Sequence, residues 1–108
     1  MGLGDKIMYI QCPDLSENKF VSIYTNFKDS TYRLTFKWNE YCNCCLFSIY
    51  DSNGELVNGG KALTTKSIIH TDRRKVPTLY FRHEEDLSVE PTPETLKEYI
   101  LAYEDTTE

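Results

Sequence analysis

The chain has 108 residues, a length that fits one domain and leaves little room for a second. With 40% hydrophobic residues, including eight Tyr, five Phe and one Trp, it can form one modest core, which excludes a disordered chain. Its formal net charge of -5 opposes non-specific attraction to phosphate backbones and anionic bilayers, so we expect neither nucleic acid nor a membrane as a partner.

The clearest pattern is an alternation of period two over residues 31–39. This alternation predicts a half-buried strand. Residues 20–27 are rich in β-branched and aromatic side chains, and Lys28-Asp29-Ser30 between the two segments favours a turn. We therefore predict a hairpin, whose second strand directs one alternating set of side chains inward: Tyr32, Leu34, Phe36 and Trp38.

Further short strands follow along the chain. Residues 45–50 are mostly apolar and stop at Asp51-Ser52-Asn53-Gly54, a sequence typical of a tight hairpin loop. Leu56-Val57 begins the return strand, and we expect Gly59-Gly60 to end it. Other short extended pieces are predicted at residues 62–63, 67–69 and 79–81. Strands at such intervals indicate an all-β antiparallel sandwich or barrel.

The C-terminal segment admits two interpretations. Thr92-Pro93-Glu94 is typical of a helix start, and residues 96–103 show helical spacing. The same residues also place Tyr99, Leu101 and Tyr103 at alternating positions, which is a strand pattern. The local pattern does not decide between helix and strand.

The polar or glycine-rich ends, residues 1–6 and 104–108, are expected to fray. We accordingly expect a partly extended N-terminal segment over 1–19, a single β domain over 20–104 and a frayed tail over 105–108. The first residues lack the basic-then-apolar order of a secretory signal, and no run of 18 apolar residues could span a membrane, so we expect a soluble chain made inside the cell.

The order of these segments resembles a known family. The matching features are the alternating strand 32–39, the hairpin segment 47–57, the glycine-containing stretch 59–63, and a Pro-Thr turn at 91–96 that leads into the aromatic strand 99–103. Taken in this order, they resemble the small plug proteins of phage contractile-tail baseplates, of the cyanophage type. Lys97, the Cys cluster and the long connection 71–90 depart from the family's pattern.

The resemblance implies a short helical turn followed by a strand at the C-terminus. It also implies a structural component of the virion, in a contractile phage tail or a related particle, seated centrally in the baseplate near the hub and tube. The expected partners are other baseplate, hub or tube proteins, together with further copies of the chain in a cyclic homo-oligomer. Assembly in the bacterial host cytoplasm follows from the same resemblance.

Cysteine and histidine offer the only alternative chemistry. Cys42, Cys44 and Cys45 crowd together, with Cys12 elsewhere, so we expect free thiols and neither a disulfide framework nor a zinc site. His70 and His83 lie beside carboxylates, but no nucleophile, phosphate loop or dinucleotide motif accompanies them. We therefore predict no cofactor, no metal and no catalytic residue.

Aromatic and basic residues suggest where partners bind. Tyr is favoured at interfaces because one end is apolar and the other can form a hydrogen bond. The one basic run, residues 73–75, could contact an acidic patch such as Glu84-Glu85-Asp86 on a neighbouring subunit. The interface candidates are Tyr24, Tyr50, Arg73, Arg74, Lys75, Tyr80, Tyr99 and Tyr103.

Two other classes of function stay open. The first is a free-standing β-sandwich that binds a small ligand or a glycan through Trp38, Tyr41 or Tyr50, although the phase of Trp38 in its strand directs it inward. The second is a metal-dependent enzyme based on the Cys and His residues. Saturable sugar binding by a monomer would favour the first class, and unfolding on chelation of zinc would favour the second.

Overall fold

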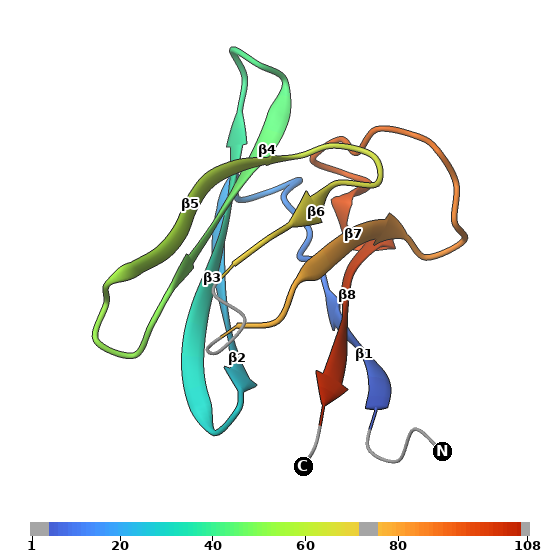
Figure 1. Cartoon of the computed structure of the whole chain (residues 1–108). Coiled ribbons are helices and arrows are strands. Elements are labelled where there is room, and N and C mark those ends of the chain that lie inside the picture. The colour runs from blue at the N-terminus through green and yellow to red at the C-terminus, as the bar shows by residue number, and fades with distance from the viewer. Residues whose placement is uncertain (1–4, 72–75, 107–108) are drawn as a thin grey trace.

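Two four-stranded antiparallel sheets face each other in the computed structural model, which describes residues 5–71 and 76–106 (Figure 1). This arrangement confirms the predicted all-β antiparallel fold and, of the two predicted forms, sandwich or barrel, shows the sandwich. One sheet has the strand order β1-β8-β7-β6 and the other the order β2-β3-β4-β5. The elements are β1 (Asp5–Gln11), β2 (Phe20–Phe27), β3 (Ser30–Asn39), β4 (Cys44–Tyr50), β5 (Leu56–Leu63), β6 (Ile68–Ile69), β7 (Leu79–His83), a 3-10 turn η1 (Leu96–Glu98) and β8 (Tyr99–Thr106).

The hydrophobic core fills the space between the two sheets. The four side chains of β3 that were predicted to face inward are all buried, and Phe36 packs on Phe47 with 5.1 Å between ring centroids. From the other sheet, Phe81 stacks on Tyr99 at 4.9 Å. Period-two alternation therefore predicted the inner face of β3 correctly, because successive side chains of a strand point to opposite faces.

The predicted hairpin of β2 and β3 is present, and its loop contains only two residues. β2 and β3 pair in continuous register from Phe20↔Lys37 to Phe27↔Ser30. Lys28 and Asp29 both have positive φ, at 50° and 70°. Two such residues form the turn whose twist matches that of the flanking strands.

The β4–β5 hairpin differs from the prediction at its second strand. Its loop is the expected one, with Gly54 at φ 82°. However, Gly59-Gly60 does not end β5, which runs on to Leu63. The strand instead contains an irregularity: the pairing register shifts along β4, Gly60 has φ 67°, and the N–H of Gly60 donates to Ser48 Oγ at 3.0 Å. The glycines therefore permit a bulge inside the strand.

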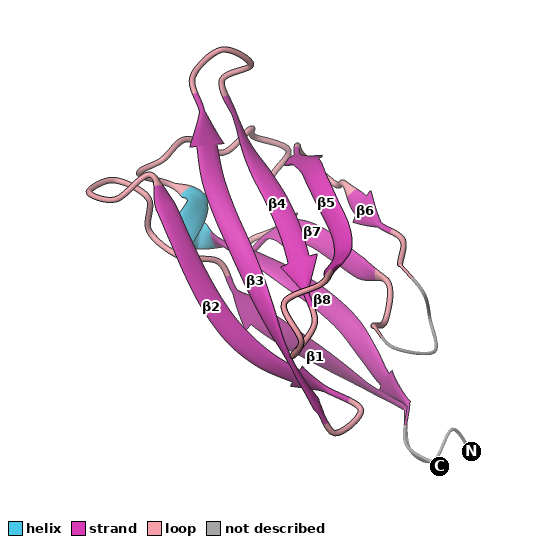
Figure 2. Ribbon diagram, turned by 90° about the vertical axis from the view of Figure 1, so that its left-hand side faces the viewer, coloured by secondary structure: helices cyan, strands magenta, loops and turns pink. Residues whose placement is uncertain are grey.

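The C-terminal segment is a short turn followed by a strand, as the family resemblance implied. Helical spacing over residues 96–103 was misleading beyond η1, because β8 lies between β1 and β7 and pairs with both (Figure 2). A central strand satisfies its backbone polar groups on both sides, and this outweighs a local preference for helix. The turn itself is held by Thr92 and Thr95, whose side chains and backbones hydrogen bond to each other.

The N-terminal segment contributes a strand that the local sequence did not reveal. Residues 5–11 form β1, which pairs with β8 from Asp5↔Thr106 to Gln11↔Ile100, so residues 5–6 and 104–106, which we expected to fray, lie in paired strands. Beyond β1, Cys12 and Leu15 are buried in the core. Pairing with a distant strand stabilises these ends, and local polarity could not reveal it. The sheet therefore begins upstream of residue 20.

Candidate interaction surface

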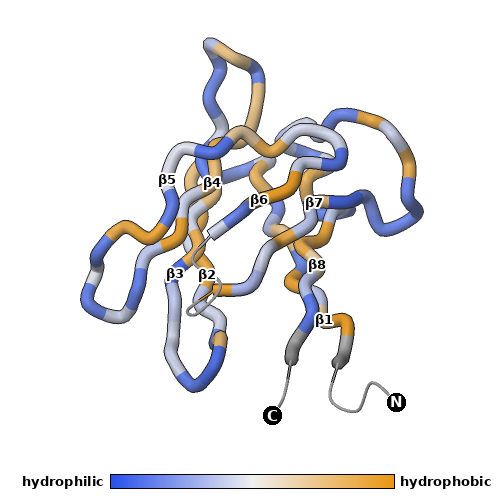
Figure 3. The backbone as a smooth tube through the Cα atoms, in the orientation of Figure 1, coloured by the Kyte–Doolittle hydropathy of each residue, from blue (hydrophilic) through white to orange (hydrophobic). Residues whose placement is uncertain are grey.

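An apolar row of side chains crosses the outer face of the β1-β8-β7-β6 sheet. The strand registers align Tyr9 with Ala102, Ala102 with Tyr80, and Tyr80 with Ile68. Tyr9 is 63% exposed and Ile68 43% exposed. We define the outer apolar face as this row with the neighbouring apolar side chains of the same face: Ile7, Tyr9, Ile68, Tyr80, Ile100 and Ala102. Figure 3 shows hydrophobic segments along these strands.

A groove of about 380 Å³ lies on this face, between β1, β8 and β7. One charge of each sign borders it, from Arg82 and Glu104. The Arg82 guanidinium carbon lies 5.8 Å from the centroid of the Tyr80 ring, which is a cation–π distance. An apolar centre with charged groups at its margin is the usual composition of a protein–protein contact.

A second row crosses the outer face of the other sheet. Here the registers align Tyr24, Arg33, Tyr50 and Leu56. The Arg33 guanidinium carbon lies 4.6 Å above the Tyr50 ring. Tyr24 is 70% exposed and Leu56 58% exposed. This row is more polar than the outer apolar face, because Arg33 lies within it.

The structure divides the predicted interface residues among three places. Tyr80 belongs to the outer apolar face, while Tyr24 and Tyr50 share the row on the opposite sheet. Tyr99 is 1% exposed and its hydroxyl donates to the Val89 carbonyl, so it is a core residue and not a surface contact. Tyr103 is also buried and packs edge-on against Phe27, although it borders the groove.

The basic run of Arg73, Arg74 and Lys75 lies outside the described residues. Sequence reasoning missed Ile7, Tyr9 and Ile68 of the outer apolar face. The available signal was the segment 7–10, where apolar residues occupy both faces of a strand and not only one. Such a pattern indicates a strand whose second face also has something to contact.

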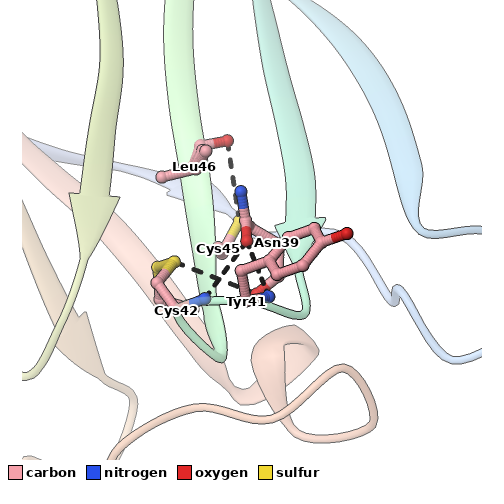
Figure 4. The surroundings of a disulfide bond; sticks show 6 residues. Asn39, Tyr41, Cys42, Cys45 and Leu46 are labelled. Carbon is pink, nitrogen blue, oxygen red and sulfur yellow. Dashed lines mark hydrogen bonds between the residues drawn. A yellow bond between two sulfur atoms is a disulfide. The ribbon is translucent and has the colours of Figure 1, made fainter.

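The cysteines differ from the expected set of free thiols. Cys42 and Cys44 form a disulfide, while Cys12 and Cys45 are free and buried. Asn43 between the bridged pair has φ 55°, and this left-handed turn sets the two Cα atoms 5.4 Å apart, within normal disulfide reach. The loop is also braced by Asn39, whose Oδ1 accepts from the N–H groups of Tyr41 and Cys42 (Figure 4).

Both free thiols are buried, and burial disfavours their ionisation. Burial raises the pKa of the Cys12 thiol well above its usual value and that of Cys45 to about 12. A thiol that keeps its proton is a poor nucleophile and a poor metal ligand. Among residues 5–71 and 76–106, no group of three or more Cys, His, Asp or Glu side chains is arranged to hold a metal ion.

The two histidines occupy structural positions. His83 packs edge-on against Tyr99, its Nδ1 accepts from the Glu85 N–H, and its Nε2 lies 3.2 Å from Glu98 Oε1. His70 is exposed, and its carbonyl accepts from the Asn58 side chain. The aromatic residues of the glycan alternative are separated as well: Trp38 is buried, Tyr41 is fully exposed at the β3–β4 loop, and Tyr50 is half-buried beneath Arg33.

A small β-sandwich with an exposed apolar face has the features of a protein that binds a protein partner. Comparison with known protein families identifies the family. The family model for the cyanophage baseplate Pam3 plug gp18 matches residues 7–107, and the chain belongs to this family. It is therefore a structural protein of a phage tail baseplate, a role that involves contact with other baseplate proteins and points away from catalysis. Neither the curated proteins nor the solved structures contained a match. No helix in the described part of the chain is long and apolar enough to cross a membrane.

Proposed function

We propose that the chain sits centrally in a contractile-tail baseplate, near the hub and tube, and acts there by packing against neighbouring subunits. The observation that carries the proposal is the outer apolar face, where Ile7, Tyr9 and Ile68 are each more than 40% exposed on one sheet surface. Large apolar side chains gathered on one face are a feature of surfaces that become buried in a partner. Membership of the baseplate plug family supports another baseplate protein as that partner.

The mechanism is assembly and not chemistry. Each contact of modest area gains strength when several copies close into a ring, because later contacts become intramolecular. Tyr80 lies in the outer apolar face, and the row of Tyr24 and Tyr50 offers a second surface on the other side of the sandwich. Two opposed surfaces allow one chain to bridge two neighbours. Neither a cofactor nor nucleic acid or membrane takes part in this proposal, and assembly occurs in the host cytoplasm.

The contact of the basic run stays a prediction of this proposal. Arg73, Arg74 and Lys75 would face an acidic patch on a neighbouring subunit, and residues 84–86 provide such a patch, exposed on the β7–η1 connection. Electrostatic complementarity of this kind sets the register of assembly more than its affinity.

The test is complementation of a phage that lacks the chain, followed by mass spectrometry and electron cryomicroscopy of purified tails. Tyr9→Ser should strongly reduce incorporation into tails. The matched control is Tyr41→Ser, the same substitution at a fully exposed Tyr in the β3–β4 loop, outside the outer apolar face, which should leave incorporation unchanged. Equal incorporation of Tyr9→Ser and the parent would exclude this face as the contact. Absence of the parent chain from tails, or its location at the baseplate rim, would overturn the proposal itself.

A further inference from the structure

The β2 strand is an unprotected edge of its sheet. It is the first strand in the order β2-β3-β4-β5, and along its eight residues it pairs with β3 without a register shift. Its sequence, Phe-Val-Ser-Ile-Tyr-Thr-Asn-Phe, contains neither a charged residue nor Pro. Natural proteins usually shield an edge strand with charge, Pro, a bulge or shortness, because an open edge is a template for another strand.

Two of the other three edges among the described strands carry such protection. β5 contains the bulge at Gly60 and the charged Lys61. β6 has only two residues. β1 is regular like β2, but its sequence begins with the charged pair Asp5-Lys6, whereas all eight residues of β2 are uncharged. The strand of a second copy that offers the longest uncharged and regular edge to β2 is therefore β2 itself.

The hydrogen-bond phase of β2 shows which backbone groups face the open edge. The Trp38 N–H donates to the Lys19 carbonyl at 2.8 Å, so the odd-numbered positions of this segment bond toward β3. The Phe20 N–H instead donates to the Asn18 side chain. The N–H and C=O groups of Ser22, Tyr24 and Asn26 consequently point away from β3, toward the edge.

We propose that β2 pairs antiparallel with β2 of a second copy, about a two-fold axis at Ile23. In this register Ile23 lies opposite Ile23 of the second copy, and Val21 lies opposite its Thr25. These residues are all β-branched, the type that packs best between neighbouring strands. Val21 and Ile23 are half-buried and pack against the core, so the added strand extends the inner layer of the sandwich.

The register also suits the charges beside the strand. It sets the segment Glu17–Lys19 of one copy next to the turn Lys28–Asp29 of the other, so charges of both signs meet at each end while the centre stays uncharged. About six backbone hydrogen bonds form across the axis, counted from the outward groups of residues 20–26. The β2-β3-β4-β5 sheets of the two copies thereby join into one sheet of eight strands.

The inference goes beyond the proposed function, because it assigns a contact between two copies to the β2 edge, which lies in the other sheet from the outer apolar face. Light scattering and sedimentation of the isolated protein should show a dimer. Amide hydrogen exchange at Ser22, Tyr24 and Asn26 should be at least about tenfold slower in the dimer than on dilution to monomer, while Ile23 and Thr25 stay protected in both. A monomer at all concentrations, or fast exchange at these three amides in the dimer, would overturn the pairing.

Two pairs of variants sharpen the test. Ser22→Pro removes an N–H that faces the edge and should give a folded monomer, whereas Ser22→Ala keeps the N–H and should stay dimeric. Ile23→Cys should form a covalent dimer on mild oxidation, since directly opposed residues of a non-hydrogen-bonded pair lie within disulfide reach. Tyr24→Cys is the control and should not, because its opposite residue is Ser22; cross-linking by Tyr24→Cys instead would overturn the register.

These measurements need no baseplate protein. A monomeric result would leave the baseplate position intact, and absence of the chain from tails would leave the strand pairing intact. A monomer whose residues 22, 24 and 26 become protected only when another baseplate protein is added would overturn the second copy as the occupant.

Discussion

Alkaline pH should destabilise the protein through one buried thiol, Cys45. Burial raises its pKa from 9.0 to about 12, outweighing a backbone hydrogen bond from Lys37 that lowers it. Below pH 9 the thiol is protonated in both folded and unfolded chains and has no effect. Above pH 9 the unfolded chain releases the proton while the folded chain retains it, so the free energy of unfolding falls by up to about 1.4 kcal/mol per pH unit until about pH 12.

The variant that isolates this effect is Cys45→Ala. At pH 7 it should be less stable than the parent by about 1 kcal/mol, because a buried sulfur is removed. Between pH 9 and 11 the parent should lose about 2 kcal/mol that the variant keeps. Urea unfolding followed by circular dichroism at each pH gives both curves, and they should cross. Cys12 is present in both proteins; its pKa is raised chiefly by burial, and Cys45→Ala removes only the smaller cause of that shift, the charge of Cys45.

The matched control is the double variant Cys42→Ser with Cys44→Ser, which removes the disulfide but no titrating thiol. It should retain the alkaline slope of the parent. Parallel curves for the parent and Cys45→Ala across pH 9 to 11 would refute the reasoning, since they would mean that Cys45 ionises as easily in the folded chain as in the unfolded one.

One thiol titration and three substitutions have further defined outcomes. Thiol titration without reductant should find no reactive thiol in the native protein, two after denaturation and four after reduction as well; four before reduction would contradict the disulfide. Tyr99→Phe removes the hydroxyl that donates to Val89 and should lower the free energy of unfolding by about 1 kcal/mol in urea titration, while an unchanged value would show that this bond adds nothing. Phe36→Ala empties a fully buried site and should cost about 3 to 5 kcal/mol by the same assay; a loss below 1 kcal/mol would mean the site is not packed. Gly60→Ala meets no neighbouring atom but must adopt φ 67°, so calorimetry should show a loss of about 1 kcal/mol, and no loss would indicate that the bulge relaxes.

The local sequence was sufficient wherever one strand face is buried and the other exposed. Residues 31–39 alternate strictly, and the structure buries the predicted set from Tyr32 to Trp38. The turn at Lys28-Asp29-Ser30 was predictable for the same local reason. By contrast, Gly59-Gly60 was expected to end a strand, but the pair lies inside β5 at a bulge. Glycine pairs occur both at strand ends and at bulges, so the local sequence does not distinguish the two.

The candidate surface was only partly accessible from the sequence. Tyr24, Tyr50 and Tyr80 were selected by residue type, and each lies on an outer face. Residue type selected Tyr99 equally, yet that ring stacks on Phe81 in the core. Whether a tyrosine faces outward depends on which face of its sheet the other sheet covers. Residues 99–103 are apolar or aromatic on both faces, so the local sequence does not reveal which face is covered.

The sequence by itself determined the β class, the inner face of β3, the position of most strands and, through the order of its motifs, the family. The tertiary structure alone decided that β1 pairs with β8, that Tyr9, Ala102, Tyr80 and Ile68 align in one row, and that β2 is left at an open edge. The reason is that side-chain alternation is a property of one strand, whereas pairing, register and edges arise from backbone hydrogen bonds between strands far apart in the chain.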